Sequence, residues 1–143
     1  MWLGIAWQGA AISDLNIQLR QTELRPYDRQ ILGGWPYEKE DEWRARSAVT
    51  NASKLTAPLL VQHGADDLNV PYQQIVEFVD AAKKADAPGA SVTFHSYEGE
   101  KHGNQKPENQ EAYLRRTAEF FCEHLMPWNG TANPAPTLLH SRM

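Results

Sequence analysis

The sequence predicts an α/β fold in which three parallel strands are flanked by helices, and three stretches of the chain support this class. Residues 58–63 begin with four apolar residues in a row, show no helical spacing and lead into Gly64, which is typical of a strand buried on both faces. Residues 71–85 carry apolar side chains three and four positions apart, as an amphipathic helix does. Residues 91–97 are rich in β-branched and aromatic residues at period two and predict the next strand. Strands that alternate with helices pair in parallel through right-handed crossovers.

The start of the chain predicts one further strand and a short helix. Residues 2–10 combine two tryptophans with small residues and have no polar start, so we expect a buried strand near residues 4–9. Asp14, together with Ser13, can cap a short helical piece through Leu19. The first strand would then leave an apolar edge of the sheet without a partner, which soluble proteins normally avoid.

The segment between this helix and the central strand is predicted to be irregular at first and helical later. Prolines and glycines recur in it up to about residue 36, and we interpret this part as a long functional loop. Residues 39–47 are acidic first and basic last, which complements a helix dipole, and Trp43 is expected to face the core. Residues 47–54 approach the central strand as a second short turn or helix.

The last part of the chain predicts a long helix and a tail. Residues 107–125 have an amphipathic pattern whose expected buried side is formed by Tyr113, Leu114, Ala118, Phe121 and Leu125. Residues 127–143 contain three prolines and no periodicity, and we expect a disordered tail there. The predicted organisation is therefore one partial domain at residues 1–126, followed by that tail.

Composition excludes several classes of partner. The 14 basic residues are scattered among 18 acidic ones, for a net charge of −4, so we expect no nucleic-acid partner. No stretch approaches the apolar length of a membrane span, and the chain is expected to be soluble, with a cytoplasmic location slightly favoured although no feature assigns the compartment. The single cysteine, Cys122, lies in a helical pattern and is interpreted as an inert, half-buried residue.

Acidic residues and a histidine follow two of the predicted strands. Asp66 and Asp67 come just after the central strand, and His102 lies in the polar segment after residues 91–97. Loops at the carboxyl ends of parallel strands are where open α/β sheets place their functional groups. An acid after one strand and a histidine after a later one is the order of the last two members of a Ser-Asp-His triad.

The residues around these positions carry a resemblance to a known family. Residues 63–71 read HGADDLNVP, residues 94–109 read FHSYEGEKHGNQKPEN, and a helical pattern follows each. The chain from about Gly4 to Leu125 resembles the carboxyl-terminal part of the prolyl oligopeptidase family of serine peptidases, with acylaminoacyl-peptidase-like and dipeptidyl-peptidase-like members most similar. The resemblance implies the carboxyl-terminal half of an α/β-hydrolase fold and hydrolysis of peptide or acyl-peptide bonds, with Asp67 as triad acid and His102 as base.

One part of the family's pattern is missing. Its nucleophile lies in a G-x-S-x-G turn upstream of the acid, and no serine of this sequence has glycines at both positions. We therefore expect a fragment, a truncated gene model or a degenerate copy that cannot hydrolyse substrate alone. The competing interpretation is a catalytically inactive binding or interaction module. In either case the expected partner is the missing amino-terminal half of the domain, or a second copy joined through the first strand.

Nearby residues leave alternatives open. Asp66 could be the acid in place of Asp67 or cap the following helix, and Ser13 could approach His102, although it lacks the turn and the oxyanion hole. A second possibility is a metal ion held by four side chains, which are His63, Asp66, Asp67 and His102. None of the tight ligand spacings of zinc sites occurs in the sequence, so we expect neither a metal nor a cofactor.

Overall fold

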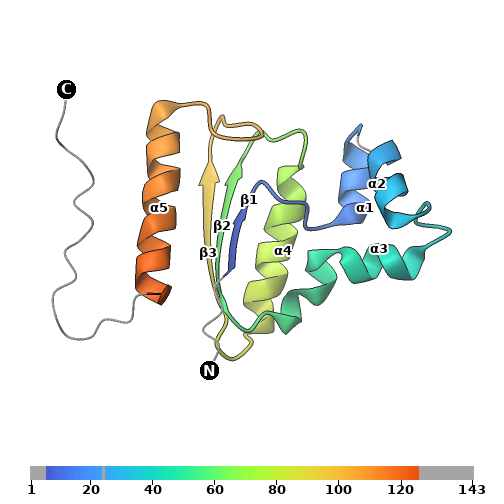
Figure 1. Ribbon diagram of the computed structural model, residues 1–143, viewed down its shortest axis with the longest axis horizontal. Helices are drawn as coiled ribbons and strands as arrows, with labels where there is room; N and C mark the ends of the chain where they lie inside the picture. Colours follow the sequence, from blue (N-terminus) through green and yellow to red (C-terminus); the bar gives the residue numbers. More distant parts are fainter. Residues whose placement is uncertain (1–5, 24, 126–143) are drawn as a thin grey trace.

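The computed structural model describes residues 6–23 and 25–125, and its strands form the predicted parallel sheet (Figure 1). The strands lie side by side in the order in which they occur in the chain, and both neighbouring pairs are parallel. Residues 1–5, which include the start of the predicted first strand, and residues 126–143, which include the predicted tail, lie outside the described residues. The strands are β1 Ala6–Gly9, β2 Pro58–Gly64 and β3 Ser91–Tyr97.

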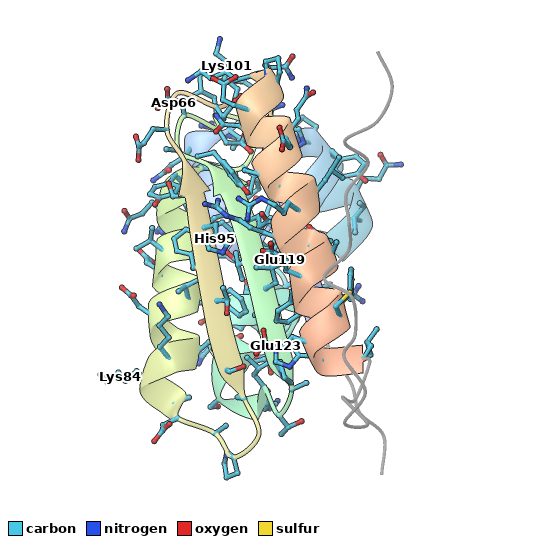
Figure 2. All side chains as sticks on the ribbon, turned by 90° about the vertical axis from the view of Figure 1, so that its left-hand side faces the viewer. Asp66, Lys84, His95, Lys101, Glu119 and Glu123 are labelled. Atoms are coloured by element: carbon cyan, nitrogen blue, oxygen red, sulfur yellow. The ribbon has the colours of Figure 1, made fainter. Side chains whose placement is uncertain are left out.

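Helices cover both faces of this sheet. Helix α4, Tyr72–Ala85, lies against one face, and helix α5, Pro107–Leu125, lies against the other (Figures 1 and 2). This cover explains why β2 is buried at every residue from Leu59 to Gly64. Within the described part of the chain, β1 is hydrogen-bonded to β2 alone, so its second edge has no strand partner there.

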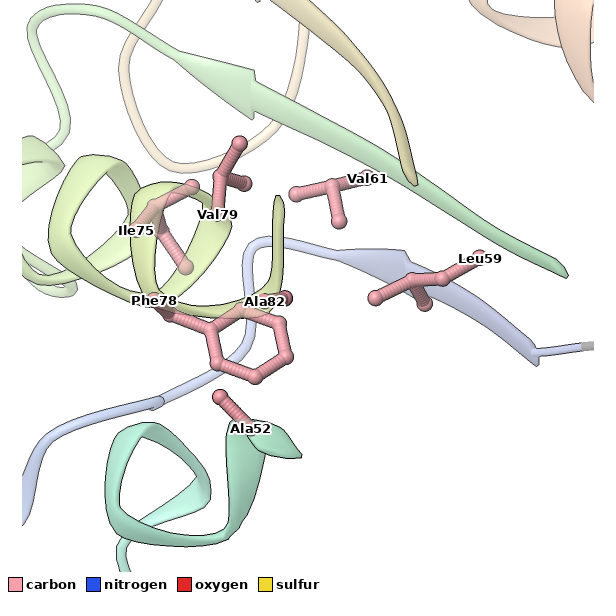
Figure 3. Close-up of a cluster of buried hydrophobic side chains, with 7 residues drawn as sticks. All are labelled: Ala52, Leu59, Val61, Ile75, Phe78, Val79 and Ala82. Atoms are coloured by element: carbon pink, nitrogen blue, oxygen red, sulfur yellow. The ribbon is translucent and has the colours of Figure 1, made fainter. Parts of the chain in front are cut away.

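The hydrophobic core lies between the sheet and α4 (Figure 3). Leu59 and Val61 point to the same face of β2 because side chains alternate along a strand. The helix contributes residues at the predicted three-to-four spacing, and each fully buried aliphatic side chain of this kind stabilises the fold by about 1.5–3 kcal/mol. The buried cluster consists of Ala52, Leu59, Val61, Ile75, Phe78, Val79 and Ala82.

Helix α1, Leu15–Gln21, begins at the predicted cap. Oδ1 of Asp14 accepts hydrogen bonds from the backbone N–H groups of Asn16 at 2.7 Å and Ile17 at 3.2 Å. These bonds satisfy two of the free N–H groups of the first turn. The helix ends at Gln21 rather than at Leu19, the predicted end.

The prediction of a long loop up to about residue 36 is wrong in its middle part, where residues Arg25–Leu32 form helix α2. The prediction rested partly on Pro26, which is only the second residue of this helix. In the first turn a backbone N–H has no helical partner, so the missing N–H of proline does not interrupt the structure there.

The two short segments before the central strand agree with the prediction. Helix α3 covers Glu40–Arg46, and a 3₁₀ helix, η1, covers Ala48–Lys54. Trp43 is buried as expected, with 1% of its surface exposed, and its Nε1–H donates to the carbonyl oxygen of Gly34 at 3.1 Å. The tryptophan therefore ties α3 to the turn that follows α2.

The predicted buried side of α5 is partly wrong. Leu114 and Leu125 are 68% and 49% exposed, whereas Phe120 is only 5% exposed. Toward the sheet the helix presents Thr117, whose hydroxyl oxygen accepts a hydrogen bond from Nε2 of Gln62 at 2.8 Å. Because a buried glutamine of β2 lies under this helix, a polar residue is favoured at the contact in place of a leucine.

Candidate active site

The loops that follow β2 and β3 meet at one end of the sheet. The two strands stay in register to their ends, with Gly64 opposite Tyr97, so both loops leave the sheet at the same level. Backbone hydrogen bonds then join the loops: the N–H of Ala65 donates to the carbonyl of Tyr97, and the N–H of Asp66 donates to the carbonyl of Glu100, each at 2.9 Å. Asp66 marks this end of the sheet in Figure 2.

The structure brings Asp67 and His102 into contact at this end. Nδ1 of His102 lies 2.9 Å from Oδ2 of Asp67, although 35 positions separate the two residues in sequence. The carboxylate is buried, and its other oxygen, Oδ1, accepts the backbone N–H groups of Asn69 and Val70, each at 2.9 Å. The Asp67 side chain is therefore held in one orientation, with Oδ2 directed to the imidazole.

This contact determines which nitrogen of His102 can react. A carboxylate only accepts hydrogen bonds, so the hydrogen of the neutral ring lies on Nδ1 and the lone pair lies on Nε2. None of residues 6–23 and 25–125 is hydrogen-bonded to Nε2, and the side chain is 47% exposed. The ring borders a pocket of about 470 Å³, which is also lined by Gly9, Ala10 and Tyr113. His102 is thus arranged as a proton acceptor that faces open space.

A second histidine lies beside the same carboxylate. Nε2 of His63 is 2.9 Å from the carbonyl oxygen of Val70 and 3.5 Å from Oδ2 of Asp67. Burial is the main cause that lowers the pKa of His63, which favours the neutral ring. Nε2 then donates to the carbonyl, and Nδ1 is left buried without a hydrogen-bond partner among the described residues. The sequence analysis considered His63 beside Asp67 only as a metal ligand, whereas the fold directs its ring to the carbonyl of Val70 and the carboxylate of Asp67.

Glu100 shapes the loop that carries His102. Its carboxylate is buried and accepts the backbone N–H groups of Gln105 at 2.7 Å and Lys106 at 3.0 Å, as well as Nδ2 of Asn109 at 2.8 Å. The hydrogen bond from the backbone of Gln105 is the largest cause that lowers the pKa of Glu100. The carboxylate therefore closes the loop on itself and connects it to the start of α5.

The alternatives that the sequence left open have different environments. Asp66 is exposed and is not the carboxylate that contacts His102. Ser13 is fully buried, and its hydroxyl donates to the carbonyl oxygen of Gln74 at 2.7 Å, so it is occupied in packing α1 against α4. In the described ranges, no three His, Cys, Asp or Glu side chains are grouped so as to hold a metal ion.

Another histidine, His95, lies away from these loops on β3, where Figure 2 shows it across from Glu119 of α5. Burial is the largest cause that lowers the pKa of His95, and the charge of Arg116 lowers it further.

A helix long and apolar enough to cross a membrane does not occur among the described residues.

Parts of known peptidases are similar to this chain. The model of the prolyl oligopeptidase family matches residues 4–127. The chain is 29% identical over 84 residues to the uncharacterized peptidase YtmA of Bacillus subtilis (strain 168), and it is 33% identical over 89 residues to dipeptidyl aminopeptidase BIII of Pseudoxanthomonas mexicana. These alignments cover 59% and 62% of this chain, but only 32% and 12% of the two relatives.

Solved structures show the same fold. A puromycin-hydrolyzing peptidase of Mycobacterium tuberculosis matches with a TM-score of 0.75 and 25% identity, over 85% of this chain and 18% of that one. An acylaminoacyl peptidase of Pyrococcus horikoshii matches with a TM-score of 0.76 and 21% identity, over 90% of this chain and 21% of that one.

The range that the family model matches includes the ends of β2 and β3 and the loops that follow them. Three parallel strands, helices on both faces and an Asp–His contact at the carboxyl end of the sheet are the features of part of an α/β-hydrolase fold. Since the family model covers residues 4–127, a range that includes every described residue, this protein belongs to the prolyl oligopeptidase family of serine peptidases.

Proposed function

We propose that this chain supplies the acid and the general base of a serine-peptidase triad, Asp67 and His102, and that a segment outside the chain supplies the nucleophilic hydroxyl. The 2.9 Å contact between Nδ1 of His102 and Oδ2 of the buried Asp67 is the observation that carries the proposal. Membership of a peptidase family supports it. The nucleophile is assigned to another segment because no serine of the sequence lies in a G-x-S-x-G turn.

In the proposed reaction, the hydroxyl oxygen attacks the carbonyl carbon of the substrate while its proton passes to Nε2 of His102. The imidazolium that forms is stabilised by the Asp67 carboxylate at Nδ1. Nε2 then gives this proton to the amine as the carbon–nitrogen bond breaks, and an acyl-enzyme remains. Water attacks the acyl group by the same route, which releases the acid and restores the hydroxyl.

The proposed substrates are peptides or acyl-peptides. This choice rests on the names of similar proteins, which include a dipeptidyl aminopeptidase, an acylaminoacyl peptidase and a puromycin-hydrolyzing peptidase. The chain spans less than a third of each of these proteins. The pocket beside His102 would therefore be completed by residues that this chain does not contain.

A chimeric enzyme tests the proposal. Residues 4–127 replace the matching segment of the Pseudoxanthomonas mexicana relative, whose remaining chain is expected to provide the nucleophile. We expect the chimera to hydrolyse a dipeptidyl substrate, and we expect His102→Gln or Asp67→Asn to lower kcat by about ten-thousandfold. The matched control is Asp66→Asn, because Asp66 is exposed and does not contact His102. A folded chimera in which Asp66→Asn abolishes hydrolysis and Asp67→Asn does not would contradict the assignment.

The second candidate function is an inactive interaction module. The absence of a G-x-S-x-G turn and the unpaired edge of β1 within the described residues favour it. Both candidates predict that the isolated chain does not react with a fluorophosphonate probe. Only the peptidase proposal predicts that the chimera reacts with the probe and that His102→Gln greatly slows this reaction, because the base is needed to activate the hydroxyl.

A further inference from the structure

A series of buried amide side chains connects the beginning of α1 with the loop that carries Asp67. Gln18 on α1 and Gln74 on α4 are both 0% exposed. Nε2 of Gln74 donates to Oε1 of Gln18 at 2.9 Å. Buried polar atoms are normally hydrogen-bonded. The other hydrogen bonds of the two amides therefore show which backbone segments Gln18 and Gln74 hold in place.

Gln74 is fixed by the backbone that leads into α1. Its Oε1 accepts the N–H groups of Ser13 at 2.8 Å and Asp14 at 3.0 Å. In return, the hydroxyl of Ser13 donates to the backbone carbonyl of Gln74 at 2.7 Å. Because both backbone N–H groups need an acceptor, the Gln74 oxygen faces them, and Nε2 is directed to Gln18.

Gln18 passes this constraint to the loop of the acid. Its Nε2 donates to the carbonyl oxygen of Asn69 at 2.8 Å, and Thr22 Oγ1 lies 3.3 Å from the same nitrogen. The backbone N–H of Asn69 donates to Oδ1 of Asp67 at 2.9 Å. Asn69 is therefore held at its carbonyl by Gln18 and at its N–H by the carboxylate that contacts His102.

We infer that Gln18 is a positioning residue for Asp67: by holding Asn69 it fixes the loop that aims the carboxylate at His102, and Gln74 keeps Gln18 in the orientation this requires. An apolar side chain of similar volume could fill the space between α1 and α4, but it would leave Nε2 of Gln74 without its acceptor. It would also leave the carbonyl of Asn69 without the Gln18 donor, whereas a fully satisfied amide network specifies one arrangement of the loop. The catalytic meaning of the inference rests on the proposed function, but the effect on the loop does not.

Amide hydrogen exchange, followed by NMR in the 143-residue chain, tests the inference. The informative signals are the N–H groups of Asn69 and Val70, which both donate to Asp67. In Gln18→Met, we expect exchange at these two amides to become about tenfold faster. The amides of β2 are the internal reference, and they should accelerate less. Their exchange reports the stability of the sheet rather than that of the loop.

Two further variants make the outcome decisive. Trp43→Phe removes a buried hydrogen bond of α3 that does not involve the loop, and it should leave the ratio of loop to β2 exchange rates unchanged. If Gln18→Met does not fold, Gln18→Asn replaces it, because its amide is neutral like that of glutamine but is one methylene too short to reach the carbonyl of Asn69.

Loop and β2 amides that accelerate equally, or loop amides that do not accelerate, would overturn the inference. Since no substrate is involved, an inactive chimera would refute the proposed function and leave this result intact.

Discussion

Asp66 and Asp67 are adjacent in sequence, but the fold gives their carboxylates different environments. Asp66 is exposed, and its backbone N–H, rather than its side chain, ties the two loops together. Asp67 is buried, is held by two backbone N–H groups and contacts His102. A carboxylate that is fixed in this way can orient an imidazole and stabilise its charge, whereas an exposed one is free to move.

At the residue scale, we expect the Glu100 carboxyl to make the stability of the folded chain depend on pH. Its hydrogen bonds lower the pKa of the carboxyl in the folded chain below the ordinary value of 4.5. The stabilisation is therefore fully present above pH 4.5, and it is lost as the pH falls through the lower pKa of the folded state. We expect the urea midpoint to fall over this range, and we expect Glu100→Gln to have a lower midpoint at pH 7 and a weaker pH dependence.

The control for this prediction is Glu111→Gln on the exposed side of α5. It should keep the pH dependence of the unchanged chain. A pH profile that is the same in Glu100→Gln and in the unchanged chain would show that the Glu100 carboxylate does not stabilise the loop.

The contact between Asp67 and His102 could be expected from the sequence, but the groups that support it could not. Asp67 and His102 could be found because each follows a strand and stands in a recognisable motif. Glu100 is one of several acidic residues in a polar segment, and Gln18 is a polar residue in a short helical pattern. Their burial arises from contacts between distant segments, and local spacing carries no signal for such contacts.

At the scale of elements, Gly64 allows β2 to end directly against the loop of His102. A Cβ atom at this position would lie within 3.0 Å of the backbone carbonyl oxygens of Glu100 and Lys101. Backbone atoms cannot move aside as the end of a side chain can. The close approach of the two loops therefore requires glycine here.

Gly64→Ala is expected to lower the free energy of unfolding by about 1–3 kcal/mol and to displace His102 from Asp67. Chemical denaturation measures the first effect, and a crystal structure of the variant measures the second. Gly34→Ala is the matched control, because the atoms nearest its Cβ belong to the flexible side chains of Lys39 and Glu38. Equal losses of stability in the two variants would contradict the role given to Gly64.

The elements that the sequence predicted well are those whose own pattern decides their structure. Helix α4 has a continuous apolar stripe, and β2 has an unbroken buried run. Helix α2 was missed because a proline in its first turn resembles a loop signal. The prediction of the buried face of α5 was partly wrong because this helix packs against Gln62 of the sheet. The position of this polar residue under α5 follows from the strand pairing and not from the sequence of the helix.

At the scale of the whole molecule, the unpaired edge of β1 is the feature with the largest consequence. Within residues 6–23 and 25–125, β1 has a strand neighbour on one side only. Unpaired N–H and C=O groups along such an edge can bind another strand. In the proposed enzyme, the segment that supplies the nucleophile would be placed on this side.

We predict that the isolated chain self-associates through this edge. Light scattering should show a mean mass that rises with protein concentration and exceeds that of a 16.2 kDa monomer. The chimera with the Pseudoxanthomonas mexicana relative should not show this rise, because the relative's own chain would cover the edge. A monodisperse monomer of the isolated chain at all concentrations would count against the prediction.

The central claim, that Asp67 and not Asp66 holds the imidazole of His102, is tested most directly by the proton NMR spectrum of the isolated chain. The Nδ1–H of a histidine that donates to a buried carboxylate is protected from solvent and resonates far downfield. We predict such a signal, absent in His102→Gln, lost in Asp67→Asn and retained in Asp66→Asn. A downfield His102 signal that survives Asp67→Asn, or no such signal in the folded chain, would contradict the account.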